Sequence, residues 1–134
     1  MHEEAIRWPN DRPEAGTRAS ELDPDDPEVV ARFFHGLSDA TRIQILQFLL
    51  DGPRTAGEIV RQVDRQQASV SSHLGCLRFC GFVHARRDGR NVVYEIVDNR
   101  IREILRMGRR HIAENLDQIV ACRVIAPAGG GDLG

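Results

Sequence analysis

Residues 55–97 read TAGEIVRQVDRQQASVSSHLGCLRFCGFVHARRDGRNVVYEIV, and this stretch decides the fold. Thr55 is followed three residues later by Glu58, a capping-box pattern that predicts the start of a short helix. After a brief polar connection, residues 66–81 carry apolar side chains at helical spacing and end at a glycine, which predicts a second helix. Two short helices in succession are typical of a helix-turn-helix.

The second half of the same stretch has the pattern of a β-hairpin. Residues 82–87 and 91–97 alternate in polarity and are rich in β-branched and aromatic side chains, with Asp88-Gly89 as the turn between them. A helix-turn-helix followed by a hairpin is the order of a winged helix-turn-helix. In that fold the second helix enters the DNA major groove and the hairpin lies beside it.

Helices are predicted on both sides of this stretch. Residues 26–38 have apolar side chains at helical spacing, and we expect them to form a first helix of the core. Ser38 or Asp39 would cap the next helix, which runs to the stop signal at residues 51–53. Its expected core stripe consists of Ile43, Leu46, Leu49 and Leu50. Residues 98–120 predict one long terminal helix with an apolar face. The expected fold class is mainly α with a β-hairpin (α+β).

Length and composition agree with one ordinary domain. The chain has 134 residues, of which 41% are hydrophobic and 28% charged, so neither a disordered nor a fibrous protein is indicated. We expect a flexible N-terminal arm over residues 1–24, a DNA-binding and dimerisation domain over 25–120, and a C-terminal tail over 121–134. No apolar run is long enough to span a bilayer and no signal peptide is evident, so we expect a cytoplasmic protein without membrane contact.

Polar and basic side chains gather where DNA would be read. The charges are uneven, because residues 1–28 hold nine acids and three arginines, while residues 65–90 hold five arginines and one acid. We expect DNA contacts from the start of the second helix and from the hairpin tip. The residues are Gln66, Gln67, Ser69, Ser71, Ser72, His73, Arg86, Arg87 and Arg90. The alternative is that these side chains only solvate a helix face and a turn.

Three segments carry a resemblance to a known family. LSDATRIQILQFL at residues 37–49, SVSSHLGCLRFCGFV at 69–83 and RRDGRNVVYEIVD at 86–98 resemble the ArsR/SmtB family of metal-responsive repressors. The most specific part is the pattern S-x-H-L-x-x-L-R-x-x-G-x-V, which starts here at Ser71. The resemblance covers roughly residues 28–120. It implies a homodimer that represses an operator in double-stranded DNA without metal and releases it on binding an effector. It also implies that the first and last helices form the dimer interface.

Two of the family's metal sites are not expected in this chain. The cysteine motif on the helix before the recognition helix would fall on residues 57–61, which contain no cysteine. The zinc motif on the terminal helix would use Asp98, a histidine two residues on, His111 and Glu114. Arg100 stands where that first histidine is required, and a cation neither replaces an imidazole ligand nor tolerates a nearby divalent ion.

Cys76 and Cys80 form a third candidate site on the expected recognition helix. Four residues apart, the two side chains lie on one helical face, so two thiolates can share one ion. Cys122, beyond the terminal helix, is the third candidate ligand. The alternative is that the pair only packs at the edge of the core. The arrangement resembles the cadmium- and lead-sensing CmtR branch, which implies that Cys122 comes from the other protomer.

Three thiolates without nitrogen or oxygen ligands favour soft ions. We therefore expect Cd(II) or Pb(II) as the effector, followed by Hg(II) or As(III), and no organic cofactor. Thiol oxidation and a metal-independent regulator remain alternatives, as does a winged-helix protein used only for protein contacts. The sequence has no catalytic motif of the common hydrolase, nucleotide-binding or zinc-peptidase types, so no enzyme is expected.

Overall fold

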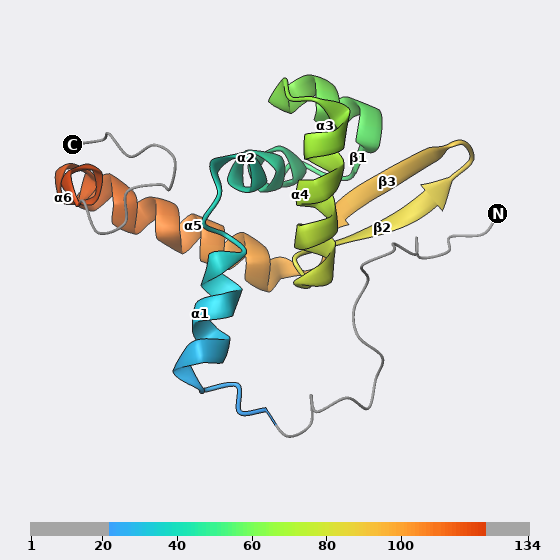
Figure 1. The fold of residues 1–134 in the computed structure, drawn as a ribbon. Coiled ribbons are helices and arrows are strands. Elements are labelled where there is room, and N and C mark those ends of the chain that lie inside the picture. Colours follow the sequence, from blue (N-terminus) through green and yellow to red (C-terminus); the bar gives the residue numbers. More distant parts are fainter. Residues whose placement is uncertain (1–21, 123–134) are drawn as a thin grey trace. The chain divides into compact units, whose positions relative to one another are not determined.

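The computed structural model describes residues 22–122. The chain divides into two compact units, and the boundary in the sequence falls between Val97 and Asp98. The first unit is a winged helix-turn-helix and the second consists of two helices (Figure 1). The elements of the first unit are α1 (Pro27–His35), α2 (Ala40–Leu49), β1 (Arg54–Thr55), α3 (Ala56–Val63), α4 (Gln67–Phe79), β2 (Val83–Asp88) and β3 (Asn91–Ile96). The elements of the second unit are α5 (Asn99–Glu114) and α6 (Leu116–Ala121).

Side-chain caps fix where the helices of the first unit begin. Asp39 rather than Ser38 caps α2, because its carboxylate accepts hydrogen bonds from the backbone N–H groups of Thr41 and Arg42. The predicted capping box at α3 is confirmed. The Thr55 hydroxyl accepts from the backbone of Glu58 at 3.1 Å, and the Glu58 carboxylate accepts from the backbone of Thr55 at 2.8 Å.

The core of the first unit surrounds α2, which packs against α3, α4 and β3. Ile45, Leu46 and Leu49 are fully buried. The predicted stripe was wrong in two places, because Ile43 and Leu50 are only half-buried. The buried residues Thr41, Ile45, Leu46 and Leu49 still form one helical face, but this face is rotated about the helix axis from the predicted one.

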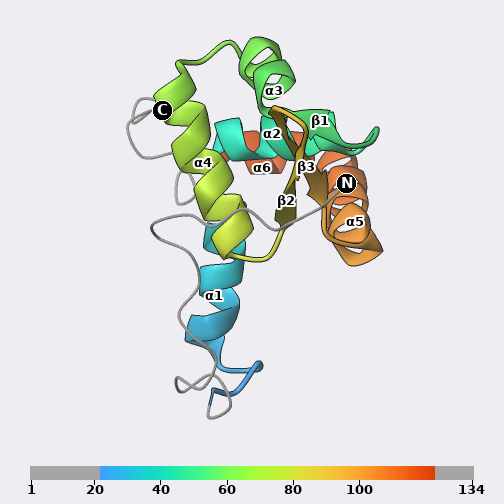
Figure 2. The same ribbon diagram turned by 90° about the vertical axis from the view of Figure 1, so that its right-hand side faces the viewer.

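The helix-turn-helix consists of α3, a tight turn and α4 (Figure 2). The turn passes through Asp64, which adopts the left-handed conformation with φ of 52°. The predicted apolar face of α4 is confirmed, since Val70, Leu74 and Leu77 are all buried. The helix ends before Gly81, whose φ of 85° is a conformation that favours glycine and turns the chain into the hairpin.

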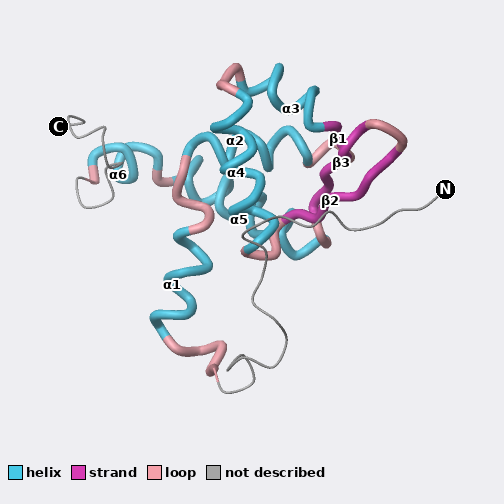
Figure 3. Tube along the Cα trace, turned by 45° about the vertical axis from the view of Figure 1, so that its right-hand side comes forward, coloured by secondary structure: helices cyan, strands magenta, loops and turns pink. Residues whose placement is uncertain are grey.

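The hairpin belongs to a three-stranded antiparallel sheet with the strand order β1-β3-β2. Asp88 pairs with Asn91, so the two-residue turn is Gly89-Arg90 rather than the predicted Asp88-Gly89. Gly89 supplies the positive φ, 64°, that such turns need. The short strand β1 had not been predicted. The tip of the hairpin projects beyond the helices of the first unit (Figure 3).

Helix α1 lies at the edge of the first unit and contributes no buried residue, although a core helix had been predicted. The ring of Phe33 on this helix packs against Phe82, with the two ring centroids 5.1 Å apart. Phe34, on the same helix, leaves 54% of its surface exposed.

The second unit has a break where one long helix had been predicted. Asn115 leaves the helical conformation, with φ of −133° and ψ of 30°, and its side chain donates to the carbonyl of His111 at 3.0 Å. Large apolar side chains on both helices of this unit are exposed, namely Met107, Ile112, Leu116 and Val120. Among the described residues, no helix is long and apolar enough to cross a membrane. Most of the predicted arm and tail lies outside the described residues.

Candidate nucleic-acid interface and thiol pair

The first turns of α4 present polar side chains to solvent. Gln66 occupies the N-cap position without a capping hydrogen bond from its side chain, and both it and Gln67 are exposed. Ser71 and Ser72 are exposed as well, while Ser69 is half-buried. The first turns of this helix therefore offer amide and hydroxyl groups of the kind that contact base edges and phosphates.

His73 differs from its polar neighbours because it already has partners within the protein. Its Nδ1 lies 3.3 Å from Nη1 of Arg42 and 3.8 Å from a carboxylate oxygen of Asp39. Only 21% of the His73 side chain is exposed. Sequence reasoning missed both partners, which are 31 and 34 residues away along the chain, and no local pattern links them to the histidine.

Asp39 is the anion of this cluster. Burial by itself would raise the pKa of its carboxyl group, but the backbone hydrogen bond from Arg42 and the nearby positive charges outweigh it; these charges are that of His73 whenever its ring is protonated and that of Arg42. The pKa of Asp39 therefore lies below its ordinary value, and the carboxylate stays ionised in neutral solution.

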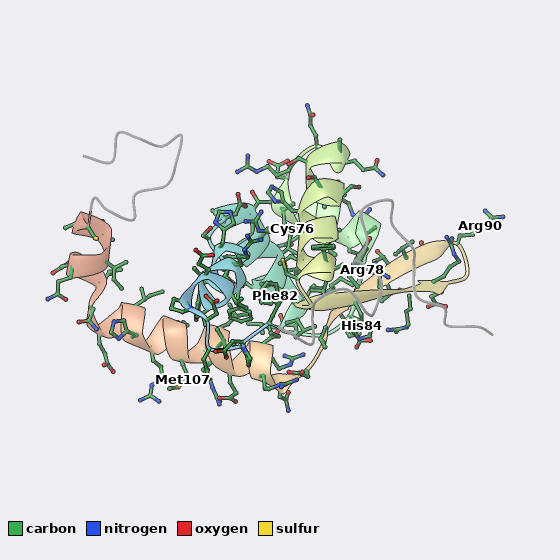
Figure 4. The ribbon with its side chains drawn as sticks, turned by 60° about the horizontal axis from the view of Figure 1, so that its bottom comes forward. Cys76, Arg78, Phe82, His84, Arg90 and Met107 are labelled. Carbon is green, nitrogen blue, oxygen red and sulfur yellow. The ribbon has the colours of Figure 1, made fainter. Side chains whose placement is uncertain are left out.

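The hairpin presents arginines of two kinds. Arg87 and Arg90 are exposed, and Arg90 stands in the turn (Figure 4). Arg86 instead donates to the carboxylate of Glu95 across the hairpin at 2.6 Å, and Nε2 of His84 lies 3.6 Å from the same oxygen. Of the three arginines predicted to contact DNA, two thus present exposed cations, while the third is already paired with a carboxylate.

The thiol pair lies at the C-terminal end of α4, with Cys76 in the helix and Cys80 as its C-cap. Cys76 is half-buried and Cys80 is exposed, and the backbone N–H of Cys80 donates to the carbonyl of Cys76 at 2.9 Å. This i to i+4 bond places the two residues one helical turn apart on the same side, as predicted. Sulfur donors at this spacing suit a soft ion. Cys80 also adjoins the end of α1, since a Cβ built on Gly36 would lie 3.5 Å from its Sγ.

Cys122 follows α6 in the second unit. It is half-buried, and its backbone N–H donates to the carbonyl of Ile119 at 3.3 Å. Within residues 22–122, no three His, Cys, Asp or Glu side chains lie close enough together to hold a metal.

At the start of α5, Arg100 stands where the zinc motif requires a histidine, and its side chain is bonded to Asp98, another residue of that motif. The guanidinium of Arg100 donates to the carboxylate of Asp98 at 2.7 Å. The side-chain hydrogen bond from Arg100 is the main reason why the pKa of Asp98 lies below its ordinary value. His111, further along the helix, is exposed.

Comparison with known proteins gives consistent matches. The family described as "Bacterial regulatory protein, arsR family" matches residues 39–85. A probable mercury resistance operon repressor of Streptomyces lividans is 41% identical over 103 residues, 77% of this chain and 82% of that protein. The HTH-type transcriptional regulator CmtR of Mycobacterium bovis is 40% identical over 76 residues, 57% of this chain and 64% of that protein.

Solved structures agree on the fold. Rv0081 of M. tuberculosis superposes with a TM-score of 0.66 at 36% identity, covering 71% of this chain and 96% of that one. The homodimeric winged helix-turn-helix DNA-binding domain of Mb0332 from Mycobacterium bovis superposes with a TM-score of 0.64 at 27% identity. That match covers 78% of this chain and 95% of the other. The predicted winged helix-turn-helix is thus confirmed.

Proposed function

This chain belongs to the arsR family of bacterial regulatory proteins, and on that premise we propose that it is a repressor released from DNA by a soft metal ion. It binds operator DNA as a homodimer without metal. The observation that carries the proposal is that Cys76 lies on α4 and Cys80 caps its C-terminal end, while the first turns of the same helix present polar side chains for DNA.

The DNA-binding surface combines two parts of the first unit. The exposed amides and hydroxyls of α4 would enter the major groove, while Arg87 and Arg90 would reach phosphates from the hairpin. Ser69 is half-buried and Arg86 is paired with a carboxylate, so we assign these two residues a smaller share of direct contact.

A homodimer would cover apolar helix surfaces that are exposed in the single chain. Helix α1 buries no residue, and the large apolar side chains of α5 and α6 are exposed. Unpartnered apolar helix faces are typical of protein interfaces. The homodimeric Mb0332 domain, which shares this fold, supports the same assembly.

We propose that the ion is held by Cys76, Cys80 and Cys122, with Cys122 supplied by the partner protomer. Two sulfurs at one-turn spacing fit a thiophilic ion, and the chain has only one further cysteine. The donor set and the similarity to CmtR favour Cd(II) or Pb(II). Because each ligand binds as a thiolate, we expect affinity to fall as the pH is lowered.

Metal and DNA would be coupled because both use α4. Tying the end of this helix to another segment restrains its position in the groove. A coupling free energy of about 1–3 kcal/mol changes affinity by roughly 5- to 150-fold, which is enough for regulation.

The test is fluorescence-anisotropy binding to the promoter of the protein's own gene, titrated with Cd(II), Pb(II), Hg(II), As(III) and Zn(II) under reducing conditions. We expect tight binding without metal and release by a soft ion. Serine replacements at Cys76, Cys80 and Cys122 should abolish release while leaving metal-free binding unchanged. His111→Ala is the control, because it removes a possible ligand outside the proposed set. Release that survives all three serine replacements would disprove the thiol site.

Mercury is a second candidate effector for a specific reason. The relative from Streptomyces lividans is named as a probable mercury resistance operon repressor, and its match extends over 77% of this chain. Release at lower concentrations of Hg(II) than of Cd(II) or Pb(II) would assign the chain to mercury.

A further inference from the structure

Arg42 connects three elements of the first unit. It lies on α2, and its Nε donates to the carbonyl of Gly36 at 2.8 Å while Nη2 donates to the carbonyl of His35 at 3.2 Å. These carbonyls belong to the C-terminal end of α1, where backbone acceptors lack partners within the helix. The remaining terminal nitrogen, Nη1, faces His73 on α4.

The contact between Arg42 and His73 has only one possible direction. A guanidinium has five donors and no acceptor, so Nδ1 of His73 must accept with its lone pair. The neutral imidazole then carries its proton on Nε2. Asp39 would favour the opposite arrangement, with a proton on Nδ1. Its carboxylate oxygen lies 3.8 Å from Nδ1, which is beyond hydrogen-bond distance, and the same oxygen already accepts from two backbone N–H groups.

We infer that Arg42 is a positioning residue that makes His73 a hydrogen-bond donor to DNA through Nε2–H. This inference rests on the proposed function. Two hydrogen bonds to the carbonyls of Gly36 and His35 hold the guanidinium independently of His73, so it fixes the orientation of the ring. The acceptor on DNA is an oxygen or nitrogen of a base edge or a phosphate oxygen, since each accepts from an N–H donor.

The first measurement is the tautomer of His73 in the full-length protein, read from long-range ¹⁵N–¹H NMR correlations at about pH 8, where imidazoles are mostly neutral. We expect a protonated Nε2 and an unprotonated Nδ1 in the wild type, and a mixture of tautomers in Arg42→Met. Arg42→Lys retains a cationic donor and should restore part of the wild-type signature. A wild-type proton on Nδ1 would overturn the inference.

The second measurement is DNA affinity in two variants that separate the ring nitrogens. The amide nitrogen of glutamine superposes on Nε2 of histidine, whereas that of asparagine superposes on Nδ1. We therefore expect His73→Gln to bind promoter DNA nearly as well as the wild type, and His73→Asn to bind about tenfold more weakly, as for one lost hydrogen bond. Equal affinity of the two variants would contradict the inference.

Two controls separate the sources of any loss. Arg65→Met removes an exposed cation just before α4, so it reports the effect of charge alone, and its His73 signature should not change. Non-specific duplex DNA separates the acceptors, because a lost phosphate contact weakens both duplexes while a lost base contact weakens only the promoter. If the wild type binds no DNA, the proposed function fails, while the NMR signature still decides whether Arg42 sets the tautomer.

Discussion

Gly36 lies where α1 meets the end of α4, and we expect its replacement by alanine to destabilise the protein. Its backbone is right-handed helical, with φ of −61°, so alanine brings no conformational strain. The added Cβ would instead lie 2.8 Å from Cε2 of Phe82 and 3.3 Å from the carbonyl oxygen of Phe33. Phe82 is fully buried, so its ring has little room to retreat.

The magnitude follows from two opposing effects. Overpacking of a buried site costs about 1–3 kcal/mol, while replacing a glycine stabilises by about 0.4–1 kcal/mol through the unfolded chain. We expect a net loss of about 1–2 kcal/mol. For a domain of this size that lowers the Tm by roughly 5–15 °C.

Urea and thermal denaturation at one fixed protein concentration would measure the change. Gly75→Ala is the matched control, because it lies within α4 and, apart from its chain neighbours and the adjoining helix backbone, no described atom lies within 4 Å of its added Cβ. That variant should be more stable than the wild type by about 0.5–1 kcal/mol. If Gly36→Ala is as stable as the wild type, the packing at this junction is not as close as described.

Three further results are expected. Thr55→Ala should lower the free energy of unfolding by about 1 kcal/mol in denaturant titrations, because it removes the cap of α3. The pKa values of Asp39 and Glu58 lie below their ordinary values of 3.8 and 4.5, so the folded state binds fewer protons than the unfolded chain. Their contribution is present above those values and disappears as the pH falls through the folded-state pKa values, which denaturation at a series of pH values would detect. Glu95→Gln should remove the negative charge that lies beside Arg86, tighten DNA binding, and steepen the logarithmic salt dependence of anisotropy titrations by up to about 0.9.

Each of these results has a control that separates it from a general effect. Thr55→Ser keeps a hydroxyl cap and should be nearly as stable as the wild type. Asp39→Asn keeps a capping acceptor without the charge, so it should lose less stability in acid, and an unchanged acid profile would contradict the reasoning. Glu103→Gln removes another arginine-paired carboxylate, on α5 rather than on the hairpin, and an equal change in salt dependence would show that net charge alone matters.

Local signals in the sequence were sufficient where a few neighbouring residues determine the structure. The capping box at Thr55 and the apolar face of α4 depend on contacts within a turn or two, and both were predicted. Strand β1 has only two residues and exists through its pairing with β3, which lies about 40 residues away, so no periodicity marks it. The end of α5 at Asn115 was missed because apolar spacing continues across it.

The residues of the candidate site also differ in how much of their arrangement could be predicted from the sequence. The one-turn spacing of Cys76 and Cys80 follows from helical geometry, so it could be predicted from their separation of four positions in the sequence. The partners of His73 and Arg86 could not, because each pair is joined by the packing of two elements rather than by proximity in the sequence. Arg86 and Arg87 are adjacent in the sequence, yet Arg86 is paired with a carboxylate while Arg87 is exposed to solvent.

The exposed faces of α1 have a consequence for how the protein responds to its own abundance. A helix without a fully buried residue in its own chain gains stabilisation from association, so in the proposed dimer folding depends on protein concentration. Each tenfold dilution would then remove about 1.4 kcal/mol from the stability of the assembled dimer. The number of copies in the cell would therefore affect two quantities, the occupancy of DNA and the fraction of chains that are folded.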